Sequence, residues 1–355
     1  MRAKFLIPVG AAVVAAACGG GAKPAAQGAV SAAKTLPPVE SSVVTPAERS
    51  LFGALPARMD APGETATGAQ IALGRTLYYE TVLSEGHDVS CNSCHALNGY
   101  GADGRRVSFG HKGQLGSRNA PTVYNAAAQV AQFWDGRSPS VEAQAKGPIL
   151  NPAEMGMPDS AAVLAHLRGS PQYRAEFAAA FPDERDPISY DNVGRAIGAF
   201  ERGLVTPSRW DRFLQGDSSA ITEQERRGAK TFVAAGCTAC HSGTYVGGQV
   251  MQKAGLVHPW PASADSGRYA VTRQPADLMV FKVPTLRNVE MTGPYFSDGS
   301  VASLDTAIAM MGRYQLGLQF TPAQIGDIHA WLRTLTGEIP VTYVANPPLP
   351  AGTGF

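Results

Sequence analysis

Cys91-Asn92-Ser93-Cys94-His95 is the stretch that decides the fold, and the same pattern recurs at Cys237-Thr238-Ala239-Cys240-His241. Cys-x-x-Cys-His is the signal for covalent attachment of a c-type haem. Each cysteine sulfur forms a thioether with a haem vinyl group, and the histidine coordinates the iron as its proximal ligand. The two copies use four of the five cysteines. The sequence therefore predicts two covalently bound haem c groups.

Two other uses of paired cysteines are weighed against this interpretation. A thioredoxin-like redox pair requires a βαβ context, and a zinc site would use both cysteine pairs together. Neither requires a histidine directly after each pair. The repeated histidine therefore favours haem.

The N-terminus has the pattern of an export signal. Arg2 and Lys4 are followed by an apolar run over residues 5–17, which is a basic n-region and an h-region. The run is too short for a membrane-spanning helix, which needs about 20 apolar residues. We predict a signal peptide over 1–17. Cys18 after three alanines resembles a lipoprotein cleavage site, and ordinary signal cleavage at the same place is the alternative.

Composition and spacing suggest how the rest of the chain is divided. Residues 18–45 read as a lipidated, flexible tether, because Gly19 to Pro38 is too rich in Ala, Gly, Lys and Pro to bury a core. The remainder suits an N-terminal haem domain over 46–205, a C-terminal haem domain over 206–340 and a tail over 341–355.

The net charge and the export signal limit the possible cellular roles. A net charge of +1, with no basic stripe, argues against nucleic-acid binding. Export fits haem c, which is attached outside the bacterial cytoplasm, so we expect a periplasmic protein whose membrane contact is an N-terminal lipid. With the other cysteines assigned to haem, no disulfide is expected.

The two halves contain an internal repeat. Pro121-Thr122 and Asn125 match Pro284-Thr285 and Asn288. Fourteen residues after each proline comes an Asp-Gly pair, preceded in both halves by aromatic residues. A repeat of this length suits a duplicated domain.

The periodicity elsewhere is mainly helical. Apolar residues share one helical face in two segments, Val193/Ile197/Phe200/Leu204 and Ile325/Ile328/Leu332/Leu335. Thr321-Pro322-x-Gln324 and Thr222-x-x-Glu225 have the pattern of helix N-termini. Strand-like alternation is scarce. The predicted fold is mainly α, with two cytochrome c-type domains, each built around one haem and joined by long Gly/Pro-rich loops.

From about Leu51 to Gly337 the chain resembles the bacterial di-haem cytochrome c peroxidases. The resemblance rests on a series of ordered stretches. They are Gly110-His111, Gly116 to Thr122, Gln132 to Arg137, Asn151 to Met155, Phe281 to Asn288, Pro294 to Ser300 and Met311 to Gly317.

The resemblance implies different roles for the two haems. The haem on His241 would take Met311 as its sixth ligand, with neighbouring Met310 as the alternative. A thioether ligand raises the potential, so this haem would accept electrons from a small cytochrome c or blue-copper protein. The haem on His95 would be the peroxide site, with His111 on its iron in the resting enzyme.

The resemblance also assigns the peroxide pocket. Glu154 matches the residue that moves a proton between the peroxide oxygens, Gln144 matches the amide that orients the peroxide, and Trp134 matches the aromatic residue between the haems. Taken alone, these would be a loop carboxylate, a helix-surface amide and a core tryptophan.

One calcium ion is implied between the domains, on oxygens of Asn119, Thr292 and Pro294. This set contains few carboxylates, so the affinity would be modest. One departure from the family is visible at Ser297, where relatives often carry histidine. It leaves open how electrons enter the second haem.

The function implied is reduction of hydrogen peroxide to water by an exported enzyme, with a homodimer left open. Two alternatives remain. One is a non-catalytic di-haem electron carrier. The other is the related di-haem enzyme that oxidises tryptophans of a partner protein, which uses tyrosine where Met311 stands; Tyr314 is the nearest tyrosine.

Overall fold

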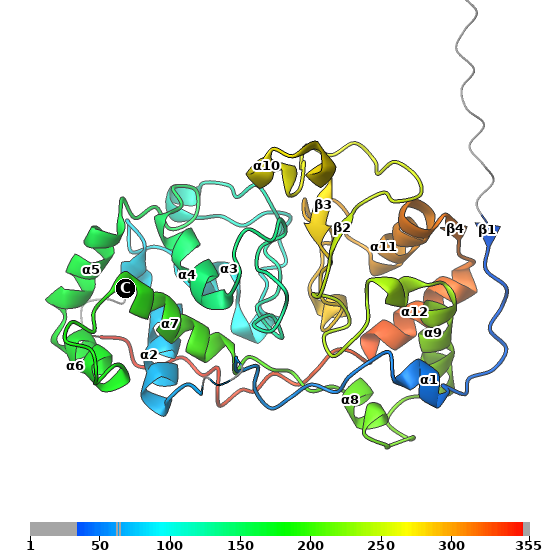
Figure 1. Ribbon diagram of the computed structural model, residues 1–355, viewed down its shortest axis with the longest axis horizontal. Helices are drawn as coiled ribbons and strands as arrows, with labels where there is room; N and C mark the ends of the chain where they lie inside the picture. The colour runs from blue at the N-terminus through cyan, green and yellow to red at the C-terminus, as the bar shows by residue number, and fades with distance from the viewer. Residues whose placement is uncertain (1–33, 62, 64, 351–355) are drawn as a thin grey trace, which may run out of the picture. The chain divides into compact units, whose positions relative to one another are not determined.

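The computed structural model describes residues 34–61, 63 and 65–350, which belong to one compact unit. The predicted signal peptide and Cys18 lie outside the described residues. Helices dominate, and the strands are short (Figure 1). The elements in chain order are β1 (Lys34–Thr35), α1 (Pro46–Arg49), α2 (Gly68–Tyr79), α3 (Cys91–Cys94), α4 (Val141–Leu150), α5 (Ser160–Gly169), α6 (Pro171–Ala180), α7 (Tyr190–Glu201), α8 (Arg209–Leu214), α9 (Glu223–Ala234), β2 (Met251–Lys253), α10 (Tyr269–Thr272), β3 (Val280–Lys282), α11 (Leu304–Met310), β4 (Leu318–Gln319) and α12 (Pro322–Arg333).

The predicted helix N-termini are confirmed. The Thr222 side chain accepts from the Glu225 backbone N–H, and Thr321 does the same for Gln324. In both cases the side chain of the third residue accepts from the cap backbone in return. These reciprocal bonds satisfy N–H groups that a helix start leaves unpaired. They begin α9 and α12, which pack together in the second half.

The first half has its own hydrophobic cluster, built mainly from α2 and α4 to α7. Val193, Ile197 and Phe200 on α7 are fully buried, as their spacing predicts. Leu204 is buried with them, although α7 ends at Glu201 and the predicted helical face therefore ends three residues earlier.

The second half has a separate cluster, built mainly from α8, α9, α11 and α12. Trp210 and Trp331 are fully buried there, and their rings meet edge to face at 5.5 Å. Ile328 and Leu332 lie on the buried face of α12, and Leu335 is buried just after its end. Figure 1 shows the two groups of helices apart, with loop-rich segments between them.

The N-terminal segment corrects one prediction. Residues 34–45 were expected to belong to a flexible tether, but β1 pairs in parallel with β4. The Leu36 carbonyl accepts from Nε2 of Gln324 at 2.8 Å, and Val44 is buried in the second cluster. Backbone pairing and these apolar side chains make residues 34–45 part of the folded unit, and the rest of the predicted tether lies outside the described residues.

The predicted C-terminal tail packs on the first half as far as it is described. Val344 is buried in the first cluster, and Tyr343 donates to the Phe200 carbonyl at 2.7 Å. Figure 1 shows this segment running back from α12 toward α7. None of the described helices is long and apolar enough to cross a lipid bilayer.

Candidate functional site

One cavity of about 1220 Å³ contains both Cys-x-x-Cys-His motifs in its wall. A pocket for one small ligand is usually roughly 300–1,000 Å³, so this cavity has room for more than one. All the predicted haem-attachment residues line it, namely Cys91, Cys94, His95, Cys237, Cys240 and His241. The structure therefore brings together two motifs that are far apart in the sequence.

Each motif forms one tight turn. The His95 backbone N–H donates to the Cys91 carbonyl at 2.9 Å, and His241 does the same to Cys237, also at 2.9 Å. In the first motif Ser90 precedes the short helix α3, and its backbone N–H donates to the Ser93 hydroxyl oxygen at 3.0 Å. The turn places the cysteines and histidine of each motif on the same cavity.

The thiols of the two motifs suit covalent attachment. Burial raises the pKa of Cys91 and of Cys237 to about 12, whereas reactive redox cysteines have a lowered pKa. The described residues contain no group of three or more His, Cys, Asp or Glu side chains that could hold a metal ion, which disfavours a shared zinc site. The four cysteines of the motifs, which are the ones the structure describes, form no disulfides with one another. Neutral thiols in an apolar cavity fit thioether formation with haem.

Both motif histidines are partly buried in the cavity wall. Burial lowers the pKa of His95, and it lowers the pKa of His241 to about 4. Backbone carbonyls oppose this effect, those of Gly101 and Pro121 at His95 and those of Val246 and Pro284 at His241. Nδ1 of His95 is 3.3 Å from the Gly101 carbonyl, while Nδ1 of His241 has no partner with full hydrogen-bond geometry among the described residues. A neutral histidine whose other ring nitrogen faces a carbonyl is well oriented to ligate a metal. The donor set therefore fits a haem iron.

The internal repeat has a structural basis in this neighbourhood. The Thr122 hydroxyl donates to the Tyr100 carbonyl, and that of Thr285 donates to Tyr245, each at 2.6 Å. The two Pro-Thr turns therefore make equivalent hydrogen bonds. The proline carbonyl of each turn lies near the motif histidine of its own half.

The repeated asparagines meet at a single residue. Nδ2 of Asn125 and Nδ2 of Asn288 both donate to the Thr206 hydroxyl, at 2.8 and 2.9 Å. All three residues are fully buried. Thr206 lies at the predicted boundary between the halves, so the repeat also fixes the two halves to a common point.

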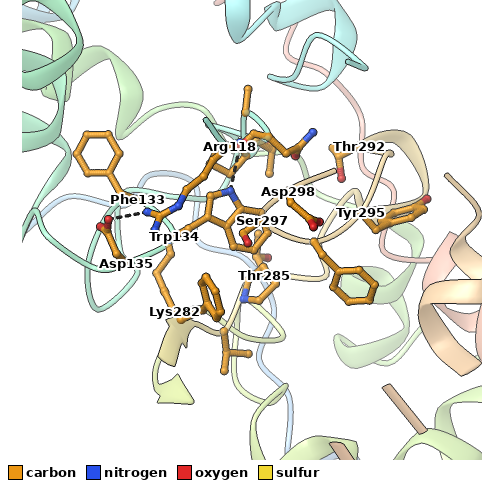
Figure 2. Close-up of a pocket in the computed structure, with 18 of the residues that line it drawn as sticks. Arg118, Phe133, Trp134, Asp135, Lys282, Thr285, Thr292, Tyr295, Ser297 and Asp298 are labelled. Atoms are coloured by element: carbon orange, nitrogen blue, oxygen red, sulfur yellow. Dashed lines mark hydrogen bonds and ion pairs between the residues drawn. The ribbon is translucent and has the colours of Figure 1, made fainter. Parts of the chain in front are cut away.

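Trp134 stands where the second half has Ser297, one residue before the repeated Asp-Gly pair. Its indole Nε1 donates to the Asn119 carbonyl at 2.9 Å, and the Asn119 N–H donates to the Ser297 carbonyl at 2.8 Å. Figure 2 shows Trp134 among Arg118, Lys282 and Ser297. Asn119 therefore connects Trp134 to the equivalent loop of the other half.

The other predicted peroxide-pocket residues line the same cavity. Gln144 is on α4, and Glu154 follows it on the loop after the helix. Nδ2 of Asn151 donates to a carboxylate oxygen of Glu154 at 2.8 Å. Burial raises the pKa of Glu154, although Arg137 and the Asn151 bond oppose the shift. A carboxyl group of raised pKa in a cavity is suited to proton transfer.

His111 lies in a slot outside the residues that line the cavity. Its Nδ1 is 3.0 Å from both oxygens of Asp88. Its Nε2 is 2.9 Å from a Glu85 oxygen, without hydrogen-bond geometry. A Cβ on Gly86 would lie 2.5 Å from the imidazole, and one on Gly156 would lie 2.9 Å away. The slot closely fits an imidazole, and the predicted position on iron stays a prediction.

Of the two candidate methionines, Met311 lines the cavity and Met310 does not. Met310 ends α11, and Met311 begins a π-helical turn, Met311–Leu316. Such turns are frequent at functional sites. Tyr314, from the same turn, is also absent from the wall and packs on Trp260 with ring centroids 5.5 Å apart.

The predicted calcium residues Asn119, Thr292 and Pro294 all line the cavity. Nδ2 of Asn119 donates to the Arg105 carbonyl at 2.8 Å, which leaves the amide oxygen as its acceptor. The structure thus brings the three residues to one cavity wall, and ion binding there stays a prediction.

Several cavity-wall residues were missed by sequence reasoning. Lys282 and Glu201 are 7% and 5% exposed, and burial raises the pKa of Glu201 to about 8. Arg118 forms ion pairs with Asp135 and Asp265. Lys282 and Arg118 lie in the stretches that carry the family resemblance, which was the available signal; nothing in the sequence singled out Glu201.

Comparison with known proteins gives consistent matches. A family model described as di-haem cytochrome c peroxidase matches residues 68–219. The cytochrome c551 peroxidase of Pseudomonas aeruginosa is 42% identical over 311 residues, covering 86% of this chain and 89% of that protein. The cytochrome c551 peroxidase of Nitrosomonas europaea is 44% identical over 272 residues, covering 76% and 80%. The crystal structure of a MauG-like protein associated with microbial copper homeostasis has a TM-score of 0.73 at 30% identity, covering 82% of this chain and 97% of that one.

Proposed function

The chain belongs to the di-haem cytochrome c peroxidase family, and from that premise we propose that it reduces hydrogen peroxide to water with electrons from a small redox protein. Each peroxide molecule takes up two electrons and two protons and leaves as two water molecules. The observation that carries this proposal is the single cavity lined by both haem motifs and by Glu154. The direct test is peroxide consumption with a reduced small cytochrome c as donor; no turnover by protein carrying both haems would favour the electron-carrier alternative.

We place the peroxide site in residues 46–205 and electron entry in 206–340. When bound, the haem on His95 supplies the iron at which the O–O bond is cleaved, and the haem on His241 supplies the second electron. The two hydrophobic clusters, one in each half, support this division. Met311 would provide the soft sixth ligand of the second site.

We assign each residue of the peroxide pocket a separate role. Glu154 carries a proton from the inner to the outer peroxide oxygen, so that water leaves instead of hydroxide. Gln144 orients the peroxide through its amide, and Trp134 lies on the route between the two halves. The Asn151 bond supports this assignment because it holds one Glu154 oxygen in a fixed place.

The haem content gives the first prediction. Acid-acetone should fail to extract haem, and the haem-to-protein ratio should be near two, because each motif holds its cofactor by two thioethers. Cys237→Ser should leave the first haem fully attached and weaken attachment of the second. Pyridine haemochrome spectra and intact mass measure both; a ratio near one in the parent would contradict the two-site assignment.

We further propose that the slot around His111 is its position when it is off the iron, and that reduction of the haem on His241, helped by calcium, favours this position. Four residues support this assignment. The carboxylates of Asp88 and Glu85 lie beside the His111 imidazole, and Gly86 and Gly156 have no side chains that would collide with it. The Gly-rich run from Gly99 to Gly116 gives the segment conformational freedom.

The slot gives the second prediction, for Gly86→Ala. The added Cβ would lie 2.5 Å from the imidazole, and overpacking of this kind costs roughly 1–3 kcal/mol. That is a roughly 5- to 150-fold loss in the population with His111 in the slot. The high-spin ferric signal of the half-reduced protein and its peroxide turnover should fall together.

Gly169→Ala, at the exposed end of α5, is the matched control for this prediction. Its Cβ would meet no atom within 4 Å, so spectra and turnover should stay those of the parent. A parent-like high-spin signal in Gly86→Ala would show that His111 does not rest in this slot during turnover.

The tryptophan-oxidising alternative depends on which residue faces the second haem. Met311 lines the cavity and Tyr314 does not, which favours the peroxidase. Replacement of Met311 by tyrosine would test how far this one ligand separates the two activities.

Three further assignments belong to the proposal. Asn119, Thr292 and Pro294 hold a calcium ion in the cavity wall. The protein works in the periplasm, held to the membrane by a lipid on Cys18. Its electron donor is a small cytochrome c or a blue-copper protein.

A further inference from the structure

A buried lysine in the cavity wall has no acidic partner in the part of the chain that the structure describes. Lys282 is 7% exposed, and its Nζ donates to Oε1 of Gln129 at 2.6 Å. Burial lowers the pKa of Lys282 to about 8, so the ammonium is mostly charged at neutral pH. A buried charge is costly unless it is paired. A charged lysine in this position therefore requires a counter-charge that the described residues do not provide.

Gln129 holds the lysine in a fixed direction. The other end of its amide donates to the Asn125 carbonyl at 3.2 Å, which leaves Oε1 to accept from Lys282. A Cβ on Gly248 would lie 2.5 Å from Gln129, so the amide is closely packed. An ammonium group has three N–H donors, and the described residues use one of them. Two donors remain for a ligand in the cavity.

The other basic residues of the cavity wall differ from Lys282. Arg118 pairs with Asp265 and Asp135, at 2.8 and 2.6 Å. Arg137 also pairs with Asp135, at 2.9 Å. The side chains of Arg106 and Lys253 are exposed to solvent. Within the described part of this wall, Lys282 alone combines burial with the lack of a carboxylate.

The position of Lys282 indicates which cofactor it faces. Its backbone N–H donates to the Trp134 carbonyl at 2.8 Å, and Figure 2 shows both residues in one group. Two residues later, Pro284 lies against His241. We propose that the Lys282 ammonium binds a propionate carboxylate of the haem held by Cys237, Cys240 and His241. This assignment rests on the proposed function, since it requires that haem in the cavity.

The test compares Lys282→Met with the parent as full-length protein carrying its haems. Loss of a cation beside the propionate should stabilise ferric iron relative to ferrous. The midpoint potential of the Met311-ligated haem should therefore fall in a spectroelectrochemical titration. Redox-difference infrared spectra of protein with ¹³C-labelled propionates should show a shifted carboxylate band. Lys282→Arg should retain most of the parent's potential and band.

Lys34→Met is the matched control, because Lys34 is an exposed lysine on β1 that does not line the cavity. Its potentials should equal those of the parent. If Lys282→Met does not accumulate, Lys282→Gln makes the same comparison with a polar side chain. Two haems with unchanged potentials and an unchanged carboxylate band in either neutral variant would overturn the assignment, as would a shift confined to the His95 haem. A parent that carries fewer than two haems would instead refute the proposed function.

Discussion

Glu154→Gln is expected to keep both haems and their spectra while losing most peroxide turnover. Removal of a positioned acid-base group typically costs ~10²- to 10⁴-fold in rate, equivalent to roughly 3–5 kcal/mol of barrier. The amide keeps the size of Glu154 and an oxygen that can accept from Asn151, which donates to the carboxylate at 2.8 Å. It cannot accept and return a proton. Stopped-flow peroxide consumption by the half-reduced variant measures the loss.

The controls separate proton transfer from placement of the loop. The backbone carbonyl of Glu154 accepts from the His111 N–H, so a disturbed loop would also alter the half-reduced spectrum. Glu223→Gln, on the exposed start of α9, should behave as the parent. Gln144→Glu should not restore turnover to Glu154→Gln unless its carboxylate reaches the outer oxygen. Turnover within about threefold of the parent, with normal haem spectra, would make Glu154 an ordinary loop residue.

Local sequence patterns predicted local structure well. The Thr222 and Thr321 caps start helices where the pattern places them. The Pro-Thr and Asn repeat predicted a duplication, and each part of it makes the same bond in both halves. The caps could be predicted because their partners lie three residues away in the sequence, whereas the shared partner of the two asparagines, Thr206, could not.

Long-range partners could not be predicted. The pairing of β1 with β4 joins residues almost three hundred positions apart, and nothing in residues 34–45 indicates it. The bond between Lys282 and Gln129 likewise joins the two halves. Burial lowers the pKa of Lys282, and burial depends on the whole fold. The slot of His111 needs glycines from two other segments, so family resemblance suggested a role for His111 but not this position.

Arg287 lies in Phe281 to Asn288, one of the stretches that carry the family resemblance, and it contributes to the stability of the fold. Its side chain is completely buried and makes a 2.6 Å ion pair with Asp211 on α8. It also donates to the carbonyls of Thr244, at 2.8 Å, and Gly53, at 3.0 Å. One guanidinium thus joins α8, the loop after the second haem motif and the N-terminal segment.

Arg287→Met is therefore expected to destabilise the holoprotein by roughly 3–5 kcal/mol, because it leaves a buried carboxylate without its partner. Burial alone would raise the pKa of Asp211, but Arg287 holds this pKa below its usual range. A carboxyl group with a lowered pKa stabilises the fold above its unfolded pKa of about 3.9, and the contribution is lost as pH falls through the folded value. The free energy of unfolding in urea, followed by circular dichroism at pH 7, measures the effect.

The pH dependence distinguishes loss of the ion pair from loss of packing. In Arg287→Met, burial without a cation should raise the pKa of Asp211. Protonation of Asp211 therefore increases the free energy of unfolding of the variant and decreases that of the parent. The difference in free energy of unfolding between the parent and Arg287→Met should become smaller as pH falls toward about 4. Asp211→Leu combined with Arg287→Met should recover part of the loss, because no uncompensated charge remains. A gap that is constant from pH 7 to 4, with no recovery in the double variant, would show that Arg287 acts through packing and its carbonyl bonds alone.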